Sequence, residues 1–457
     1  MDEAVALESR VAAAELTEGN VVRAAWRQAW PTTVAQFASA AYTLVDMFFV
    51  GKLGRDAIAG VALGGMVDNV SWIIMTGVVI ANKVFISRDI GAGRWKEAAH
   101  ASYQSFLFGF ILSLFVAVPC FLLAREILIL MGGQGEVITQ GLGYLQILSL
   151  GILVSFQMQV TRSIFEAVGD PKVPMKILIV SNILNAILAP VLIWGVGIIP
   201  ALGVNGAALA VVLARLFALG WFMILLRRTG LIVPSAWRQK PDYALLYRFI
   251  QLGVPRCLQR GVEVISGMLL MRIVAGYGTA ALAAYGVGLR IDLAMKTPGW
   301  GFTSSVITLV GQNLGAGKPE RAEKSVWIVM AMYVAFAALC GVAFFFAPRA
   351  VMGVFTQDPE VLHIGSQYLR IMTFGYMFIA IAMVSDRALS GAGDTVTPMV
   401  VACISLVVLQ ISGALLLPRV TGLGSLGIWI AIALSYGIWA GIILRFFQQG
   451  KWKHKKL

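Results

Sequence analysis

The feature that most constrains this chain is a succession of long apolar segments separated by short polar connections. A helix needs about 20 mainly apolar residues to cross the hydrocarbon core of a bilayer. Twelve segments have roughly this length: 27–50, 56–84, 98–123, 138–161, 173–198, 204–226, 245–274, 280–309, 324–347, 362–386, 397–418 and 425–447. Only 13% of the residues are charged, against about 25% in soluble proteins. The sequence therefore predicts an all-α membrane protein with twelve transmembrane helices and no separate soluble domain.

Many positions of the first half recur 224 residues later, among them Pro31 and Pro255, Asp68 and Asp292, and Tyr144 and Tyr368. The offset decreases to 221 near the end of each half, where Gly206 corresponds to Gly427. Each half has six segments, so both halves enter the membrane in the same direction and the repeat is parallel. We predict two six-helix bundles, 27–227 and 245–447, joined by a linker at 228–244. A cytoplasmic segment, 1–26, precedes them, and a basic tail, 448–457, follows.

The net charge of +13 reflects membrane topology, because the basic residues are unevenly divided between the two sides of the membrane. With the N-terminus inside, the cytoplasmic segments carry 23 Lys and Arg and the opposite side carries five. Cytoplasmic loops collect these residues, so we expect a monomeric multi-pass protein of the inner (cytoplasmic) membrane with both termini cytoplasmic. Its partners are then the lipid bilayer and small amphiphilic molecules, with no nucleic acid. The tail lysines are expected to contact anionic lipid.

Two duplicated glycine motifs lie on the cytoplasmic connections. Gly91 and Gly93, with Gly315 and Gly317, are expected to form structural turns between helices, because no phosphate-binding motif accompanies them. Gly169 and Gly393 are each followed by an aspartate, Asp170 or Asp394. We expect the glycine to end one helix and the aspartate to cap the next.

These motifs carry a family resemblance. Two Gly-Ala-Gly turns followed by Ala, two copies of Gly-Asp-x-x-x-Pro-Met, the opening run from Trp30 to Gly51 and the run from Asn182 to Pro190 together resemble the multidrug and toxic compound extrusion (MATE) family. The likeness covers roughly residues 20–450. It implies two six-helix bundles around a central cavity, alternating access, and export of organic cations or other amphiphiles in exchange for Na+ or H+.

A charged group at bilayer depth costs about 2.5–3.5 kcal/mol or more, so each one is a candidate functional residue. Asp46 lies in the first helix with no Lys or Arg within a turn, and such a carboxylate can carry a proton or, with neighbouring oxygens, hold Na+. By the resemblance, Asp46 takes the acidic position of the family's first helix, and Asn185 matches the Asn of its fifth-helix Asn-x-x-x-Asp pattern. Ala189 stands where that pattern has Asp. The missing carboxylate favours a proton over Na+ at this site.

A second candidate lies in the seventh helix, where Arg260 and Glu263 share a face at i,i+3. The resemblance implies that Glu263 is the acidic residue of the Na+-coupled branch. That branch's tenth-helix Asp falls on Ala380, and Asp386 lies close to the cytoplasmic end. Of the two acidic residues that such a Na+ site would use, only Glu263 is therefore present at its position. The alternative is that Arg260 and Glu263 form a buried ion pair that fixes two helices.

The duplicated pair Asp68 and Asp292 is the third candidate. Lys296 follows Asp292 by one helical turn, so these two are expected to form a structural ion pair. Asp68 has no cation within a turn, which favours contact with a cavity or an ion.

Other classes of protein fit less well. The three histidines, His100, His363 and His454, lie near loops or in the tail without a metal-binding motif, so we expect no enzyme, no bound metal and no cofactor beyond the coupling ion. A channel would not need isolated deep carboxylates in duplicated halves. A lipid-linked saccharide flippase of the same two-bundle plan stays as the alternative function. It would use Arg260, Arg272 and Arg290 to hold a pyrophosphate group.

Overall fold

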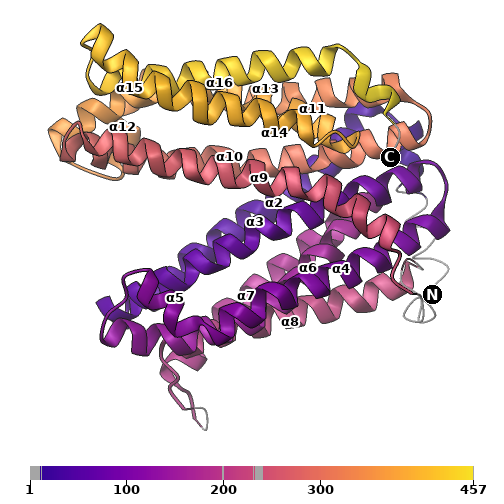
Figure 1. Cartoon of the computed structure of the whole chain (residues 1–457), viewed down its shortest axis with the longest axis horizontal. Helices are drawn as coiled ribbons and strands as arrows, with labels where there is room; N and C mark the ends of the chain where they lie inside the picture. The colour runs from indigo at the N-terminus through magenta and orange to yellow at the C-terminus, as the bar shows by residue number, and fades with distance from the viewer. Residues whose placement is uncertain (1–10, 12, 198–199, 230, 232–239, 456–457) are drawn as a thin grey trace. The chain divides into compact units, whose positions relative to one another are not determined.

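The computed structural model describes residues 11, 13–197, 200–229, 231 and 240–455, without the side chains of 42–46 and 56. Within these residues the chain forms twelve helical segments of 23 residues or more (Figure 1), which confirms the predicted architecture. By length and composition, nine of the described helices are apolar enough to cross a membrane. Most of the predicted linker, 232–239 included, lies outside the described residues.

The chain divides into two compact units, and the first holds Met1–Glu15 and Val34–Gly253. Its helices are α3 (Arg55–Gly91), α4 (Trp95–Leu122), the short α5 (Ala124–Leu130), α6 (Glu136–Val168), α7 (Lys172–Trp194) and α8 (Val204–Arg228), with the second part of α2 (Val21–Gly51) and the first part of α9 (Tyr243–Ala275).

The second unit holds Leu16–Thr33 and Val254–Leu457. Its helices are α10 (Thr279–Gly315), α11 (Pro319–Phe346), the short α12 (Pro348–Gly353), α13 (Pro359–Gly391), α14 (Val396–Ala402), a π-helical stretch (Cys403–Leu409), α15 (Gln410–Thr421) and α16 (Ser425–Gln448), with the remaining parts of α2 and α9. The short helices α5 and α12 lie at equivalent places of the repeat.

The units exchange the first parts of two helices, so they do not follow the boundaries 27–227 and 245–447. The start of α2 packs in unit 2, where Thr32 donates a hydrogen bond to the Gly301 carbonyl at 2.8 Å. The start of α9 packs in unit 1, where the Phe249 ring lies 5.1 Å from that of Phe85. Sequence boundaries follow polar loops, whereas these helices change unit in mid-course, between Thr33 and Val34 and between Gly253 and Val254.

The slip in the repeat has a structural cause. The helix α7 has 23 residues, whereas its counterpart, Val396–Thr421, has 26 and contains the π-helical stretch. The next connection spans 195–203 in the first half and 422–424 in the second. A helix three residues longer and a loop six residues shorter change the offset from 224 to 221.

The glycine turns have the left-handed backbone that favours glycine, with φ of 74° at Gly93, 70° at Gly317, 103° at Gly169 and 92° at Gly393. Gly91 and Gly315 are instead the last residues of α3 and α10.

The aspartate caps differ from the prediction by one residue. The N-caps are Pro171 and Thr395, so Asp170 and Asp394 lie one position earlier. The Asp394 carboxylate still accepts a hydrogen bond from the Thr397 backbone N–H at 3.3 Å.

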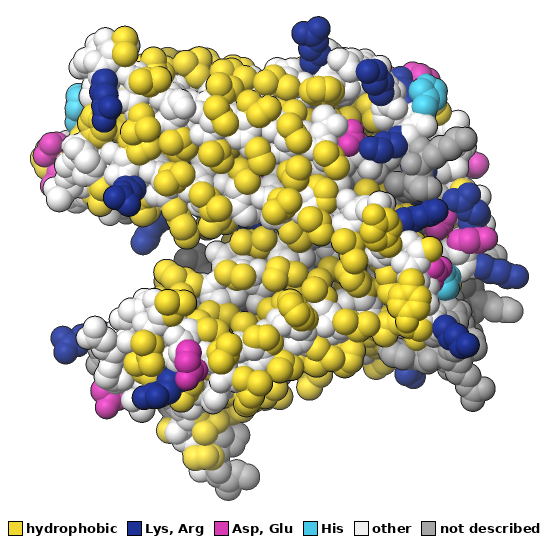
Figure 2. Space-filling model, in the orientation of Figure 1, with side chains coloured by type: hydrophobic (Ala, Val, Ile, Leu, Met, Phe, Trp, Pro, Cys, Tyr) yellow, Lys and Arg dark blue, Asp and Glu magenta, His cyan; other side chains and the backbone are white. Residues whose placement is uncertain are grey.

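Apolar side chains cover the sides of the helices, and most charged side chains in this view gather at the helix ends (Figure 2). The C-terminal tail folds back onto unit 2. Trp452 is buried and stacks on Phe447 at 5.2 Å. Lys453 lies 2.6 Å from Glu323 and 3.0 Å from Glu320, and these hydrogen bonds raise the pKa of its ammonium group. This tail lysine is therefore neutralised within the protein, rather than left for lipid.

Close packing of α7 and α8 gives a prediction. A Cβ at Gly206 would overlap the Leu192 carbonyl, whereas a Cβ at Gly220, also on α8, meets nothing within 4 Å. We expect Gly206→Ala to destabilise the protein by about 1–3 kcal/mol through overpacking. Gly220→Ala is the matched control and should be neutral or slightly stabilising. Thermal unfolding in detergent measures both, and equal midpoints for the two variants would contradict the close helix contact.

Candidate functional site

A buried polar cluster of unit 2 surrounds Asp292, on α10. Its side chain is 8% exposed, and Oδ1 accepts hydrogen bonds from the hydroxyls of Tyr368, at 2.8 Å, and Tyr376. These tyrosines are eight residues apart on α13, so two helical turns bring both onto one face. Gly288 leaves room for them, since a Cβ there would lie 2.6 Å from the Tyr368 ring.

Lys296 follows one turn after Asp292, as the expected ion pair requires. Its Nζ lies 3.6 Å from Oδ2 of Asp292, and its side chain is 29% exposed. The same ammonium lies 5.6 Å from the ring centroid of Tyr436, on α16. The pair is thus formed, but its cation is far more accessible than its anion.

Aromatic and polar side chains surround this pair. The rings of Tyr285 and Trp429 stack at 5.6 Å, and Trp429 meets the Tyr368 ring edge-on at 5.1 Å. Ser266, on α9, donates to the Leu406 carbonyl at 2.6 Å and lies 3.0 Å from Oε1 of Gln410. Leu406 belongs to the π-helical stretch, which changes the backbone hydrogen bonding of the helix and is frequent at functional sites.

Glu263 and Arg260 form the second charged group of unit 2, on α9. Their carboxylate and guanidinium lie 2.6 Å apart, and both side chains are 29% exposed. The Arg260 guanidinium also lies 5.7 Å from the Trp300 ring centroid. Ala380, at the position where the Na+-coupled branch of the family has an Asp, is fully buried. Glu263 is therefore paired and still partly accessible.

Asp386, for which the sequence predicted no role, contacts two side chains of α9. Arg256 lies 2.7 Å from its Oδ1, and Gln259 donates to its Oδ2 at 2.6 Å. Both charged side chains are almost fully buried. This ion pair joins helices 130 residues apart in sequence, so no local spacing signals it. It ties the second part of α9 to α13.

In unit 1, Asp68 has a cation after all. Arg215, from α8, lies 3.8 Å from its carboxylate and donates to the Ser155 hydroxyl at 2.7 Å. The sequence showed no sign of this cation, because Arg215 lies on another helix and not within one helical turn of Asp68. Contact of Asp68 with a cavity or an ion stays a prediction. At the offset of 221, Arg215 corresponds to Tyr436 of unit 2, so the cation stands on a different helix in each half.

Asn185 is buried on α7, together with Ala189. Neither its Oδ1 nor its Nδ2 has a hydrogen-bond partner among the described residues. The Asp46 side chain lies outside the described part. The association of Asp46 with Asn185 stays a prediction.

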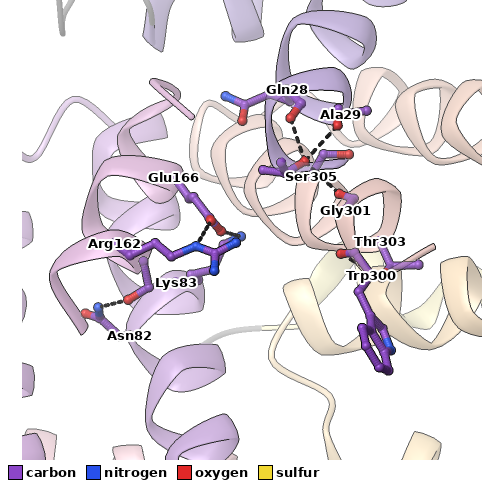
Figure 3. A network of polar contacts seen from close by, with 12 residues as sticks. Gln28, Ala29, Asn82, Lys83, Arg162, Glu166, Trp300, Gly301, Thr303 and Ser305 are labelled. Carbon is purple, nitrogen blue, oxygen red and sulfur yellow. Dashed lines mark hydrogen bonds and ion pairs between the residues drawn. The ribbon is translucent and has the colours of Figure 1, made fainter. Parts of the chain in front are cut away.

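A buried cluster that the sequence did not reveal joins α3 and α6 (Figure 3). Glu166 accepts from Lys83 at 2.9 Å and from Arg162 at 2.8 Å, and Arg162 also donates to Gln36 at 3.2 Å. Only the i,i+4 spacing of Arg162 and Glu166 was available as a signal. Among the described residues, no three His, Cys, Asp or Glu side chains form a group that could hold a metal.

Comparison with known proteins agrees with this architecture. A family model described as MatE matches residues 31–191 and 255–416, one match in each repeat. A probable multidrug resistance protein NorM of Thermotoga maritima is 26% identical over 424 residues, covering 91% of this chain and 89% of the relative. An FAD transporter of Shewanella oneidensis is 25% identical over 402 residues, covering 87% and 88%.

Solved structures show the same fold. A MATE structure in the bent conformation superposes with a TM-score of 0.89 at 20% identity, covering 96% of this chain and 97% of that one. A MOP superfamily transporter from Pyrococcus furiosus, described as having a binding pocket of reverse polarity, gives a TM-score of 0.87 at 20% identity, with coverage of 97% and 98%. The two family matches span most of the chain, and their boundaries follow the internal repeat. The chain therefore belongs to the MatE family, the multidrug and toxic compound extrusion (MATE) membrane transporters.

Proposed function

We propose that this protein is a secondary active antiporter that exports organic cations or other amphiphilic drugs in exchange for H+ or Na+. The observation that carries the proposal is Glu263, a carboxylate within a membrane helix that is paired and yet 29% exposed. An ionisable residue at this depth marks an ion or substrate pathway. The multidrug resistance names of relatives support the substrate class. We place the protein in the inner membrane with both termini cytoplasmic.

Two sites are proposed for the coupling ion. In unit 1, Asp46 takes the ion, with Asn185 offering an amide whose buried polar atoms have no described partner. Because Ala189 supplies no second carboxylate, a proton is the preferred ion there. In unit 2, Glu263 is the acceptor, and Arg260 has to release it when a cation binds. Each site then takes up one coupling cation.

A flippase, or carriage of an anionic dinucleotide as the name of one relative suggests, needs accessible cations. Of the three arginines named for the flippase, Arg260 is paired with Glu263, whereas Arg272 and Arg290 are exposed. Two other cations of unit 2 also face carboxylates, Lys296 at Asp292 and Arg256 at Asp386. This pairing favours a cationic over an anionic substrate.

Gradient-driven accumulation in proteoliposomes tests the proposal. We expect the purified protein to move tetraphenylphosphonium against its own gradient when a pH or a Na+ gradient is imposed separately. Asp46→Asn removes a titratable charge but keeps the side-chain shape, so it should reduce pH-driven accumulation to the level of empty liposomes. Undiminished pH-driven transport by a well-folded Asp46→Asn protein would remove Asp46 from the coupling site, and absence of transport under both gradients would refute antiport.

Glu263→Gln separates the two roles of the ion pair. If Glu263 holds the coupling ion, the variant loses Na+-driven transport while keeping its fold. If it only pairs with Arg260, the variant loses about 1–2 kcal/mol of stability, a value between those of exposed and buried pairs. The double change Arg260→Met with Glu263→Leu should then restore stability. Transport at several Na+ concentrations and thermal unfolding decide between them, and full retention of both properties would contradict both roles.

A further inference from the structure

The two oxygens of Asp292 have unequal partners. Oδ1 accepts from two tyrosine hydroxyls, whereas Oδ2 faces the Lys296 ammonium, which lies 3.6 Å away. A good charge-assisted hydrogen bond would be about 2.7–2.9 Å long. The carboxylate is therefore fixed by two hydrogen bonds at Oδ1, whereas its contact at Oδ2 is longer than a good hydrogen bond.

The two tyrosine hydroxyls donate to Oδ1 of the Asp292 carboxylate. They do not neutralise it. Removing the partner of a buried charge costs several kcal/mol, so some cation must stay close to Oδ2 in each state of the transport cycle. In this structure that cation is Lys296.

The Lys296 ammonium is suited to leave Oδ2 of Asp292 and to return to it. It is tethered by a flexible four-carbon stem, and its side chain is 29% exposed against 8% for Asp292. The Tyr436 ring, 5.6 Å from the ammonium, offers a cation–π contact. This ring can stabilise the ammonium when it is displaced from Oδ2.

The surroundings of Asp292 suit an organic cation. Tyr285, Trp429 and Tyr368 form a connected set of rings with centroids 5.1–6.2 Å apart. Aromatic faces beside a carboxylate attract ammonium and phosphonium groups. In unit 1 the position of Lys296 is taken by Trp72, and the cation at Asp68 is anchored to Ser155. An ammonium on a flexible stem as the counter-ion is thus a feature of unit 2.

We propose that Asp292 is the carboxylate that binds the organic cation, and that Lys296 is a tethered counter-ion that takes the place of the cation when the site is empty. The inference rests on the proposed export of organic cations. Substrate binding moves Lys296 from Oδ2 toward Tyr436. Substrate release lets it return, so that Asp292 is compensated throughout the cycle.

Equilibrium binding of tetraphenylphosphonium to the purified protein in nanodiscs, without any gradient, tests the exchange. Lys296→Met removes the competing cation and should tighten binding by about tenfold or more, because a larger fraction of the protein is then competent to bind. Asp292→Asn should abolish this binding. Arg290→Met removes the same charge from an exposed position of α10 and should leave the affinity unchanged. In transport, Lys296→Met should turn over slowly despite its tight binding.

Weaker or unchanged binding by Lys296→Met relative to Arg290→Met would overturn the proposal, as would undiminished binding by Asp292→Asn. If Lys296→Met is unstable without ligand, its rise in unfolding temperature on adding tetraphenylphosphonium replaces the affinity, and a rise no larger than that of the parent protein contradicts the exchange. Because no gradient is used, this outcome is independent of whether the protein performs antiport.

Discussion

Neutralising carboxylates inside the membrane is the constraint on which this structure depends. A buried charge without a partner costs several kcal/mol, and in each unit acidic side chains within the long helices meet cations of that same unit. The pairs are Lys83 and Glu166, Arg215 and Asp68, Arg256 and Asp386, Arg260 and Glu263, and Lys296 and Asp292. Fully buried pairs fix helices to one another, and accessible pairs can exchange their cation.

The repeat shows how one framework supports two different sites. Asp68 and Asp292 occupy the same position in the two halves, but their cations come from different helices. Arg215 reaches Asp68 from α8, whereas Lys296 lies on the same helix as Asp292. An anchored guanidinium in one unit and a tethered ammonium in the other make the halves chemically unequal. In the proposed antiport, the two units therefore have different roles.

The twelve-helix architecture was predictable from the sequence, because segment length reports on the thickness of the bilayer and the constant offset reports on the internal repeat. The pair of Asp292 and Lys296 was predictable because four residues make one helical turn. Arg256 with Asp386 and Arg215 with Asp68 were not, since helix packing, rather than local spacing, brings them together. The exchange of the first parts of α2 and α9 between units was hidden because neither helix is interrupted where it changes unit.

The most direct test of the account is whether organic cation and coupling ion exclude each other on the same protein. Tetraphenylphosphonium is added to weakly buffered, purified protein while a pH-sensitive dye records released protons, and the titration is repeated at increasing Na+. Antiport by exchange predicts either proton release that saturates together with tetraphenylphosphonium binding, or an apparent affinity for tetraphenylphosphonium that falls as Na+ rises. Saturable binding with no released protons and no effect of Na+ would contradict the account.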